Sequence, residues 1–513
     1  MRKDIREAQE KREAAGKGLC KASLIIGIVY AVLFLAFEVI LFVTGIIPTK
    51  FLVLQLVVLL LLSALIVPML ILKKAKRKNK IVAIILAGLL GIVYIIGGAY
   101  LINTVGFLDE IFGDSETITY DIIAHEENPI DDESGLPGAT IHTTTAADKD
   151  KYYGQALQTL AESYEVEFKS TDESFMDLCK DASKDKKVLV FVSDANYDIA
   201  CDQNEAVDDN TKIVAKIKVE KKALAAKETD VTTKPFNILI SGNDTKGEIL
   251  DVARSDVNII VSVNPVTKNI LLTTVPRDYF VYVPQVGASD KLTHTGNFGV
   301  DCTAESLENL LGIDINYYVK VNFTCVTELV DAIGGIDVVS EYDFTTSGRF
   351  NNGYKFKKGV NHCNGKQALA FSRERHAFAA GDIQRAKDQQ IVLSAIIEKC
   401  THSSTVLTNY SDILDSVAKY LRTNMSSDDI KSLVKMQFSD MASWHIETNI
   451  LEGTSQMAPC YSIPNLNVFS WIPSQASVTE GQARITSIFD GGDGTIPSDE
   501  QTGTDTTEST ENQ

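Results

Sequence analysis

Several signatures of well-known enzyme classes are missing from this chain of 513 residues. It has no G-x-x-x-x-G-K-[ST] loop, so the usual P-loop for nucleotide phosphates is absent. It has neither an H-E-x-x-H zinc motif nor a G-x-S-x-G nucleophile elbow. Its eight cysteines include no C-x-x-C pair, which argues against a zinc site. Zinc-protease, serine-hydrolase and P-loop chemistries are therefore not expected.

The chain also has fewer basic than acidic residues. The chain has 49 Lys and Arg residues against 68 Asp and Glu, a formal net charge of -19 at pH 7. No helix-turn-helix pattern accompanies the basic residues near the N-terminus. Nucleic acids are therefore not expected as partners, and a transcriptional regulator is the least favoured interpretation.

Long apolar runs dominate the first 104 residues. Three runs, at about 23–47, 51–72 and 81–103, each reach the roughly 20 residues that a bilayer-spanning helix needs. A secretory signal peptide has one shorter apolar core and a cleavage site, so this segment is not one. We predict three transmembrane helices within residues 23–104.

The orientation of these helices follows from the Lys and Arg residues in the short links. Seven basic residues precede the first run, and the link after the second run reads KKAKRKNK. After the third run, no Lys or Arg occurs before Lys149. We therefore expect a multi-pass plasma membrane protein with residues 1–22 as a cytoplasmic tail and everything after about residue 104 outside the cell.

An exported location permits disulfides. Seven of the eight cysteines follow the membrane segment, so at least one of these thiols stays unpaired. Cys179 with Cys201 is the best local candidate for a disulfide.

The residues after the membrane segment divide into two predicted units. Within 105–150 the chain is polar and turn-rich and reads as a connecting stretch. A helix is expected at 152–168, and strands at 187–194 and 211–219. These elements predict a small accessory α/β module over residues 105–230.

A second unit is predicted over residues 231–490. Its expected strands are joined by turn signals and interleave with helices, which indicates a mixed sheet covered by helices in an α/β fold. A long helix is expected from 381 to 399, and the principal strands at 236–241, 257–263, 269–275 and 317–323. Residues 491–513 have almost no apolar side chain and are expected to be a disordered acidic tail.

Charged residues gather at the ends of these strands. Asp244 follows the first strand, and Asp256 immediately precedes the second. If the strands run antiparallel, both carboxylates lie at one end of the sheet. The third strand also ends there, in the sequence VPRD, and brings Arg277 and Asp278.

A second cluster lies in FSRERHAFAAGDIQRAKDQQ, residues 371–390. Because side chains alternate in an extended segment, Arg373 and Arg375 are expected to point the same way. In the helix that follows, the spacing predicts one shared face for Asp382, Arg385 and Gln389.

These two clusters have the chemistry of an anion site. Arginine forks match phosphate oxygens, and hard carboxylates hold Mg²⁺ beside them. Together they indicate a site for a pyrophosphate with a divalent cation. On spacing alone, an ordinary ion-paired surface is the open alternative.

Residues 236–400 resemble the LytR-CpsA-Psr family of cell-wall enzymes. Three N-terminal spans followed by an accessory module are similar to the CpsA-like branch of that family. The matching segments, in order, are FNILISGND, RSDVNIIVSVNPVTKNILLTTVPRDYFV, KLTH, ENLLGIDINYYVKVNF, LVDAIGGIDVVS, GKQALAFSRERH and GDIQRAKDQQIVL.

The resemblance implies an activity and a set of site residues. Members transfer a glycopolymer, such as capsule or teichoic acid, from a polyprenyl-pyrophosphate carrier to peptidoglycan, forming a phosphodiester. Mg²⁺, with Mn²⁺ as an alternative, is expected at Asp244 and Asp256. The expected catalytic residues are Arg277, Arg373, Arg375, Arg385 and Asp382. The expected substrate-binding residues are Asp278, Gln389 and, as the weakest candidate, Arg254.

The sequence departs from the family pattern at a few points. Asn243 stands where a small residue is usual before the metal aspartate, and no further arginine follows PRD between Tyr279 and Pro284. The segment after KLTH is altered to TGNFGVD. Two other activities stay open: a polyprenyl-pyrophosphate hydrolase that uses water as acceptor, and a non-catalytic sensor of lipid or polymer.

Overall fold

The structure is a computed structural model. It describes residues 2–45, 47–72, 75–111, 115–145, 151–249, 252–347, 353–402, 413 and 416–496. The predicted disordered tail lies outside the described residues from 497 onward.

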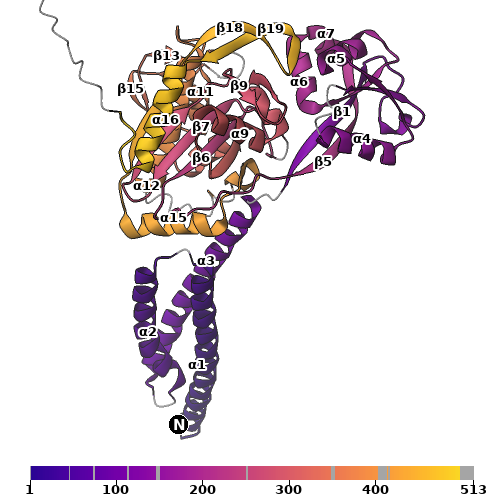
Figure 1. Ribbon diagram of the computed structural model, residues 1–513. Coiled ribbons are helices and arrows are strands. Elements are labelled where there is room, and N and C mark those ends of the chain that lie inside the picture. The colour runs from indigo at the N-terminus through magenta and orange to yellow at the C-terminus, as the bar shows by residue number, and fades with distance from the viewer. Residues whose placement is uncertain are drawn as a thin grey trace, which may run out of the picture.

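Three long helices form the N-terminal part (Figure 1). They are α1 (Arg2–Thr44), α2 (Thr49–Ile71) and α3 (Arg77–Ile111). Each contains a stretch long and apolar enough to cross a membrane, namely Lys17–Thr44, Thr49–Ile71 and Arg77–Asn103. The three predicted apolar runs therefore form three helices of membrane-spanning length.

This bundle contacts the rest of the chain at one end. Helix α15 (Ser427–Asp440) lies across that end of the bundle in Figure 1. The Nζ atom of Lys50, in the first turn of α2, donates a hydrogen bond of 2.7 Å to the carbonyl oxygen of Ser439. The larger α/β unit is thus joined to the membrane-spanning part through α15.

A five-stranded sheet forms the accessory module, with strand order β3-β2-β4-β1-β5. Strand β1 pairs antiparallel with β4 and β5, whereas β2 pairs parallel with β3 and with the central strand β4. The strands are β1 (Ser115–His125), β2 (Thr140–Thr144), β3 (Glu167–Thr171), β4 (Leu189–Ser193) and β5 (Thr211–Lys222). The helices are α4 (Lys151–Ser163), α5 (Phe175–Lys184), α6 (Asp194–Gln203) and α7 (Glu205–Asn210).

Two expectations about this module are wrong in detail. The supposed connecting stretch contains β1, whose Tyr120 and Ile122 are almost completely buried in the module core. The helix predicted to reach residue 168 ends at Ser163, and β3 begins at Glu167. Strand β3 lies at the sheet edge with mostly exposed side chains, so its sequence carries no strong alternation to mark it.

The expected disulfide is also wrong. All eight cysteines are free thiols. Cys179 is completely buried in an apolar core on α5, and burial raises the pKa of its thiol. Cys179 therefore packs as a small apolar side chain.

The larger unit is built on a six-stranded sheet with order β16-β11-β6-β7-β8-β17, here called the central sheet. Strands β6, β7 and β8 pair antiparallel in succession, which confirms the predicted meander and the mixed α/β fold. The strands are β6 (Phe236–Asn243), β7 (Val257–Asn264), β8 (Asn269–Thr274), β11 (Tyr317–Asn322), β16 (Leu421–Thr423) and β17 (His445–Ile450).

Helices cover both faces of the central sheet, as the strand sequences dictate. Alternate side chains of a strand point to opposite faces. Ile260 on β7 packs in one core with α9 (Val300–Leu311) and α16 (Gln475–Phe489). Its neighbour Val261 packs in another core with α12 (Asp382–His402) and α15. The apolar runs of these strands are therefore buried on both sides.

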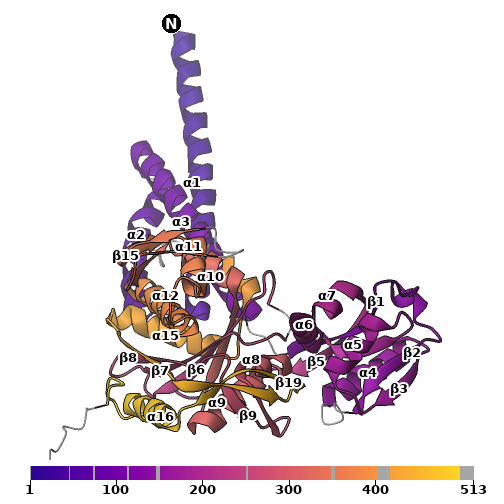
Figure 2. The ribbon, with the colours of Figure 1, turned by 90° about the horizontal axis from the view of Figure 1, so that it is seen from above.

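Smaller elements surround this layered core. The hairpin of β18 and β19 runs from the larger unit towards the accessory module in both views (Figures 1 and 2). Its Ile463 and Val468 are buried together with Met176 and Ile199 of the accessory module. The remaining elements are β9 (Phe280–Val283), β10 (Ala288–Lys291), α8 (Leu292–Thr295), α10 (Phe323–Ala332), β12 (Ile336–Ser340), β13 (Phe344–Thr345), β14 (Lys355–Phe356), β15 (Gly359–Cys363), α11 (Gly365–Arg373), β18 (Gly453–Cys460) and β19 (Ile463–Pro473).

Candidate active site

A cavity of about 170 Å³ lies where the end of β8 meets the start of α12. Six of the ten predicted site residues line it, namely Asp256, Arg277, Asp278, Asp382, Arg385 and Gln389. The two charged clusters recognised in the sequence therefore meet in one place.

The antiparallel meander explains this meeting. The backbone N–H of Asp256, just before β7, donates to the carbonyl oxygen of Gly242 at the end of β6. Arg277 follows the end of β8, so it returns to the same edge of the sheet. Helix α12 begins at Asp382, directly after Gly381, which has a φ of +47°. This turn brings the second cluster to the cavity.

Arg277 is held between two carboxylates. Its Nη1 atom lies 2.7 Å from Oδ1 of Asp256, and its Nε atom lies 3.5 Å from Oδ2 of Asp278. Burial would lower the pKa of Arg277, but the charges of Asp256 and Asp278 outweigh burial and raise it. Arg277 is therefore a permanent positive charge at the wall of the cavity.

Arg385 is a second positive charge at this wall. Its Nη2 atom lies 2.9 Å from Oδ1 of Asp382, one turn earlier on α12. Burial, followed by repulsion from Arg277, lowers the pKa of Arg385. The positive charges of Arg277 and Arg385 repel each other, and an anion bound between them would offset this repulsion.

Arg373 and Arg375 flank the cavity and do not line it. Arg375 Nη1 lies 3.8 Å from Oδ1 of Asp382. Arg373 is the last residue of α11, not part of an extended segment as expected, and its guanidinium stacks 4.1 Å from the centroid of the Phe323 ring. The charge of Arg373 still acts on both Asp244 and Asp256.

Glu374, between these two arginines, is completely buried. Its Oε1 atom accepts backbone N–H bonds of 3.0, 2.8 and 3.0 Å from Arg375, His376 and Ala377. Its carboxylate also accepts bonds from the backbone and hydroxyl of Ser347. Burial would raise the pKa of Glu374, but these donors lower it, so an ionised carboxylate fixes the turn that carries Arg375.

Asp244 and Asp256 have the chemistry for a divalent cation. Loss of hydration, followed by the charge of Asp256, raises the pKa of Asp244. A cation beside Asp244 would offset the repulsion from Asp256, and carboxylate oxygens are the ligands that Mg²⁺ prefers. The predicted pair therefore fits a hard metal ion.

The sequence interpretation left four contributors unassigned. Lys291 Nζ lies 3.2 Å from Oδ1 of Asp278, and Thr293 Oγ1 donates to Oδ1 of Asp256 at 3.2 Å. Both lie in the KLTH segment, so that motif was the available signal. Phe469 and Trp471 of β19 also line the cavity, and no motif marks them.

A larger groove of about 830 Å³ adjoins the cavity. Ile383, Ile450 and Trp471 line both. The groove runs along α12 and its walls are mixed, with apolar side chains such as Ile391 and Leu451 beside charged ones. It is therefore less apolar than a simple lipid channel would be.

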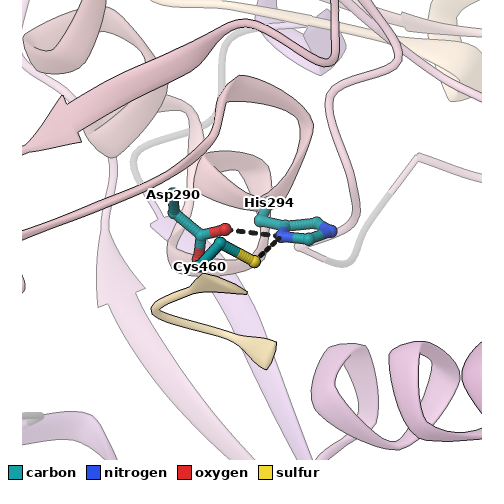
Figure 3. A group of neighbouring side chains, drawn as sticks. All are labelled: Asp290, His294 and Cys460. Carbon is teal, nitrogen blue, oxygen red and sulfur yellow. Dashed lines mark hydrogen bonds and ion pairs between the residues drawn. The ribbon is translucent and has the colours of Figure 1, made fainter. Parts of the chain in front are cut away.

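A second group of potential metal ligands lies in the core beside the site (Figure 3). His294 Nδ1 is 2.7 Å from Oδ1 of Asp290 and 4.0 Å from Sγ of Cys460. The carboxylate of Asp290 also accepts bonds from Lys291 N and from the N–H and hydroxyl of Ser462. These four donors satisfy all the acceptor positions of Asp290, so the group is a completed hydrogen-bond network that supports the KLTH segment.

Arg254 and two nearby histidines lie outside the cavity wall. Arg254 lines no part of the cavity and forms an ion pair with Asp202 of the accessory module. His294 is buried in the network just described, and His376 is exposed beside Arg375. Neither histidine lines the cavity.

Comparison with known families decides the identity of the larger unit. Residues 197–483, more than half of the chain, match the model of the LytR_cpsA_psr family. The chain belongs to this family. The match begins within α6 of the accessory module and includes the whole central sheet of this LytR_cpsA_psr family member.

Curated relatives are named polyisoprenyl-teichoic acid–peptidoglycan teichoic acid transferase TagU. The protein from Bacillus anthracis is 36% identical over 204 residues, which are 40% of this chain and 65% of the relative. The protein from Enterococcus faecalis is 35% identical over 225 residues, 44% of this chain and 72% of the relative. The match thus spans just under two thirds of the Bacillus relative's length.

Solved structures of similar proteins include B. subtilis TagV, with 28% identity and a TM-score of 0.42 over 50% of this chain and 98% of that one. TagT bound to LI-WTA has 27% identity and a TM-score of 0.42, covering 52% of this chain and 94% of the other.

Proposed function

We propose that this protein is a membrane-anchored extracellular phosphotransferase of cell-wall biogenesis. It transfers a glycopolymer from a polyprenyl-pyrophosphate carrier to peptidoglycan and forms a phosphodiester. The observation that carries the proposal is the cavity with Arg277 and Arg385 in its wall, each paired with carboxylates. The names of the TagU relatives support the same donor and acceptor classes.

The charges around the cavity suit a pyrophosphate. Arg277 and Arg385 bind its oxygens directly, and Arg373 and Arg375 add positive potential from the rim. Asp244 and Asp256 would hold Mg²⁺ or Mn²⁺, which supplies neutralisation of the phosphate charge when bound.

In the reaction, a hydroxyl oxygen of a peptidoglycan sugar attacks the phosphorus that carries the polymer. A P–O bond to the acceptor forms, the bridging P–O bond of the pyrophosphate breaks, and polyprenyl phosphate leaves. The arginines stabilise the negative charge that develops on the leaving phosphate. Asp278 and Asp382, which both line the cavity, are the candidates to accept the hydroxyl proton.

The donor's lipid requires a site close to the membrane. We infer from the Lys and Arg distribution that the N-terminus is cytoplasmic and that the central sheet is outside the cell. The apolar side chains of the adjoining groove, among them Ile383 and Ile391, are the proposed contacts for the polyprenyl chain.

The test is a transfer assay with full-length protein in proteoliposomes. It contains a polyprenyl-pyrophosphate-linked oligosaccharide, peptidoglycan and Mg²⁺. Wild type is compared with Asp256→Ala and Arg375→Ala, and with Lys357→Ala as a matched surface control, since that side chain is 80% exposed. We expect Mg²⁺-dependent conjugate in wild type and the control, and none in the two site variants.

Other outcomes point to other activities. Release of polymer phosphate without conjugate would make the protein a hydrolase. Binding of the donor without turnover would make it a sensor. Wild-type transfer rates in Asp256→Ala and Arg375→Ala would show that the site lies elsewhere.

A further inference from the structure

The segment from Val252 to Asp256 joins the accessory module to the active site. Val252 is 8% exposed and packs in the core of the accessory module, and its N–H donates to the carbonyl oxygen of Thr117 on β1 at 3.3 Å. Four residues later, Asp256 lines the cavity. The core of the accessory module and the edge of the cavity are therefore only four residues apart in the chain.

Arg254 lies in the middle of this segment. Its Nη1 atom donates to Oδ2 of Asp202 on α6. Burial would lower the pKa of Arg254, but the charge of Asp202, and then those of Asp256 and Asp244, raises it. One guanidinium thus interacts with the accessory module and with both predicted metal ligands.

Helix α6 presents a row of carboxylates on this side. Asp194, Asp198 and Asp202 recur every four residues and therefore share one helix face. Burial, and then the charge of Asp194, raises the pKa of Asp198 to about 6, and Arg254 acts against this rise. These carboxylates of α6 therefore attract the guanidinium of Arg254.

The accessory module is held firmly enough to fix that place. Lys221 of β5 is 3% exposed and pairs with Asp301 of α9. Lys320 Nζ of β11 lies 3.6 Å from Oε1 of Glu116 on β1, and both side chains are buried. Breaking a buried pair leaves an uncompensated charge, so these contacts resist displacement of the module.

We propose that α6 of the accessory module borders the active site, where Asp202 holds Arg254 outside the cavity wall at a place from which its positive charge acts on the phosphates of a bound polyprenyl pyrophosphate. The inference rests on the proposed function, because that function supplies the pyrophosphate. Asp202 touches no substrate and acts through Arg254. The accessory module then contributes to donor affinity, a role that neither the family match nor the relatives' names assign to it.

The first experiment measures binding and needs no transfer. Farnesyl pyrophosphate is titrated with Mg²⁺ into full-length wild type, Asp202→Asn and Asp209→Asn in detergent, by calorimetry. Asp209 is an exposed acid on α7 and serves as the matched control. We expect binding about fivefold weaker in Asp202→Asn, as for one partly exposed charge pair, and unchanged in Asp209→Asn. Equal or tighter binding in Asp202→Asn would overturn the proposal.

A double-variant cycle separates positioning from mere structural support. If Asp202 acts through Arg254, Asp202→Asn has no further effect on affinity in an Arg254→Ala background. Asp202→Glu, which keeps the charge, restores part of the affinity. An additional loss in the double variant would mean that Asp202 only helps to dock the module. A wild type that binds farnesyl pyrophosphate but does not transfer would refute the proposed function and leave this inference standing.

Discussion

Arg277 and Asp256 form an ion pair of 2.7 Å between Nη1 and Oδ1, although 21 residues separate them in the chain. Asp256 is also a predicted metal ligand, and Thr293 donates to the same oxygen at 3.2 Å. Asp256 therefore orients the arginine that is proposed to bind the phosphate, and it also belongs to the predicted metal-binding pair. The cation is expected to bind Asp256 and the pyrophosphate to bind Arg277. Because each ligand binds one member of this ion pair, we expect the two to bind cooperatively.

We predict that transfer requires the planar guanidinium of Arg277 and not only its positive charge. Arg277→Lys keeps a positive charge but cannot contact Asp256 and Asp278 through separate nitrogens, and it loses two-pronged binding of a phosphate. We expect kcat/KM for transfer to fall by roughly 10- to 100-fold, about 1.4–2.7 kcal/mol of transition-state stabilisation. The measurement is steady-state transfer beside the Lys357→Ala control. Full activity in Arg277→Lys would show that a point charge is enough.

Glu374 is predicted to control the placement of Arg375. Both carboxylate oxygens of Glu374 accept hydrogen bonds from N–H groups. Glu374→Gln replaces one of these oxygens with an NH₂ group, which is itself a donor. At least one hydrogen bond is therefore lost, and two donors are brought into contact. We expect the free energy of unfolding to fall by about 1–3 kcal/mol and transfer by at least about tenfold.

Thermal unfolding and farnesyl pyrophosphate affinity, measured on the same preparation, check the Glu374 prediction. Glu167→Gln is the control, since that carboxylate is exposed on the edge strand β3 of the accessory module. Unchanged affinity in Glu374→Gln would contradict a positioning role.

Parts of this architecture could be predicted because they depend on local pattern. The apolar runs of β6, β7 and β8 and the turn signal between the last two imply a meander. Once that topology is accepted, Asp244, Asp256 and Arg277 must lie at one edge. The i, i+3 and i+7 spacing of Asp382, Arg385 and Gln389 is likewise a property of the helix alone.

Other parts depend on contacts that no local pattern encodes. Trp471 reaches the cavity from β19, about 200 residues after Asp278, whose carbonyl oxygen accepts its N–H at 2.8 Å. The pairing of Arg254 with Asp202 depends on how two separately folded sheets dock. Buried Glu374 lies between two arginines in the sequence, whereas its hydrogen-bond donors are backbone groups and Ser347.

Gly296 is predicted to be required for the shape of the segment that carries Arg254. It lies in the altered TGNFGVD stretch, and a Cβ atom added there would lie 2.6 Å from the backbone N of Ser255 and would also clash with the carbonyl oxygen of Ala253. Gly296→Ala must displace this backbone, so we expect a loss of about 1–3 kcal/mol in stability together with weaker farnesyl pyrophosphate binding.

Gly154→Ala is the matched control for Gly296→Ala. Gly154 lies within α4, and nothing lies within 4 Å of an added Cβ atom. There the substitution is expected to stabilise the helix by roughly 0.5–1 kcal/mol. Equal melting temperatures for Gly296→Ala and wild type would contradict the predicted clash.

Asp388 is predicted to make stability depend on pH. It is 2% exposed on α12, and its Oδ1 accepts a bond of 3.0 Å from Gln384 Nε2. Its Oδ2 is buried and has no hydrogen-bond partner among the described residues. Burial raises the pKa of Asp388 from 3.8 to about 7, with Gln384 and Lys387 acting against the rise and Glu341 and Glu374 adding to it.

The sign of this effect follows from proton linkage. Between about pH 4 and pH 7 the folded protein retains a proton that the unfolded chain has released, so the free energy of unfolding falls as pH rises through this window. Asp388→Asn cannot ionise and removes that dependence. We expect the variant to be more stable than wild type at pH 8, by on the order of 3 kcal/mol, and equal to it near pH 4. Melting temperatures of both proteins in detergent across this range provide the measurement, and a constant difference at every pH would show that Asp388 does not titrate in the window.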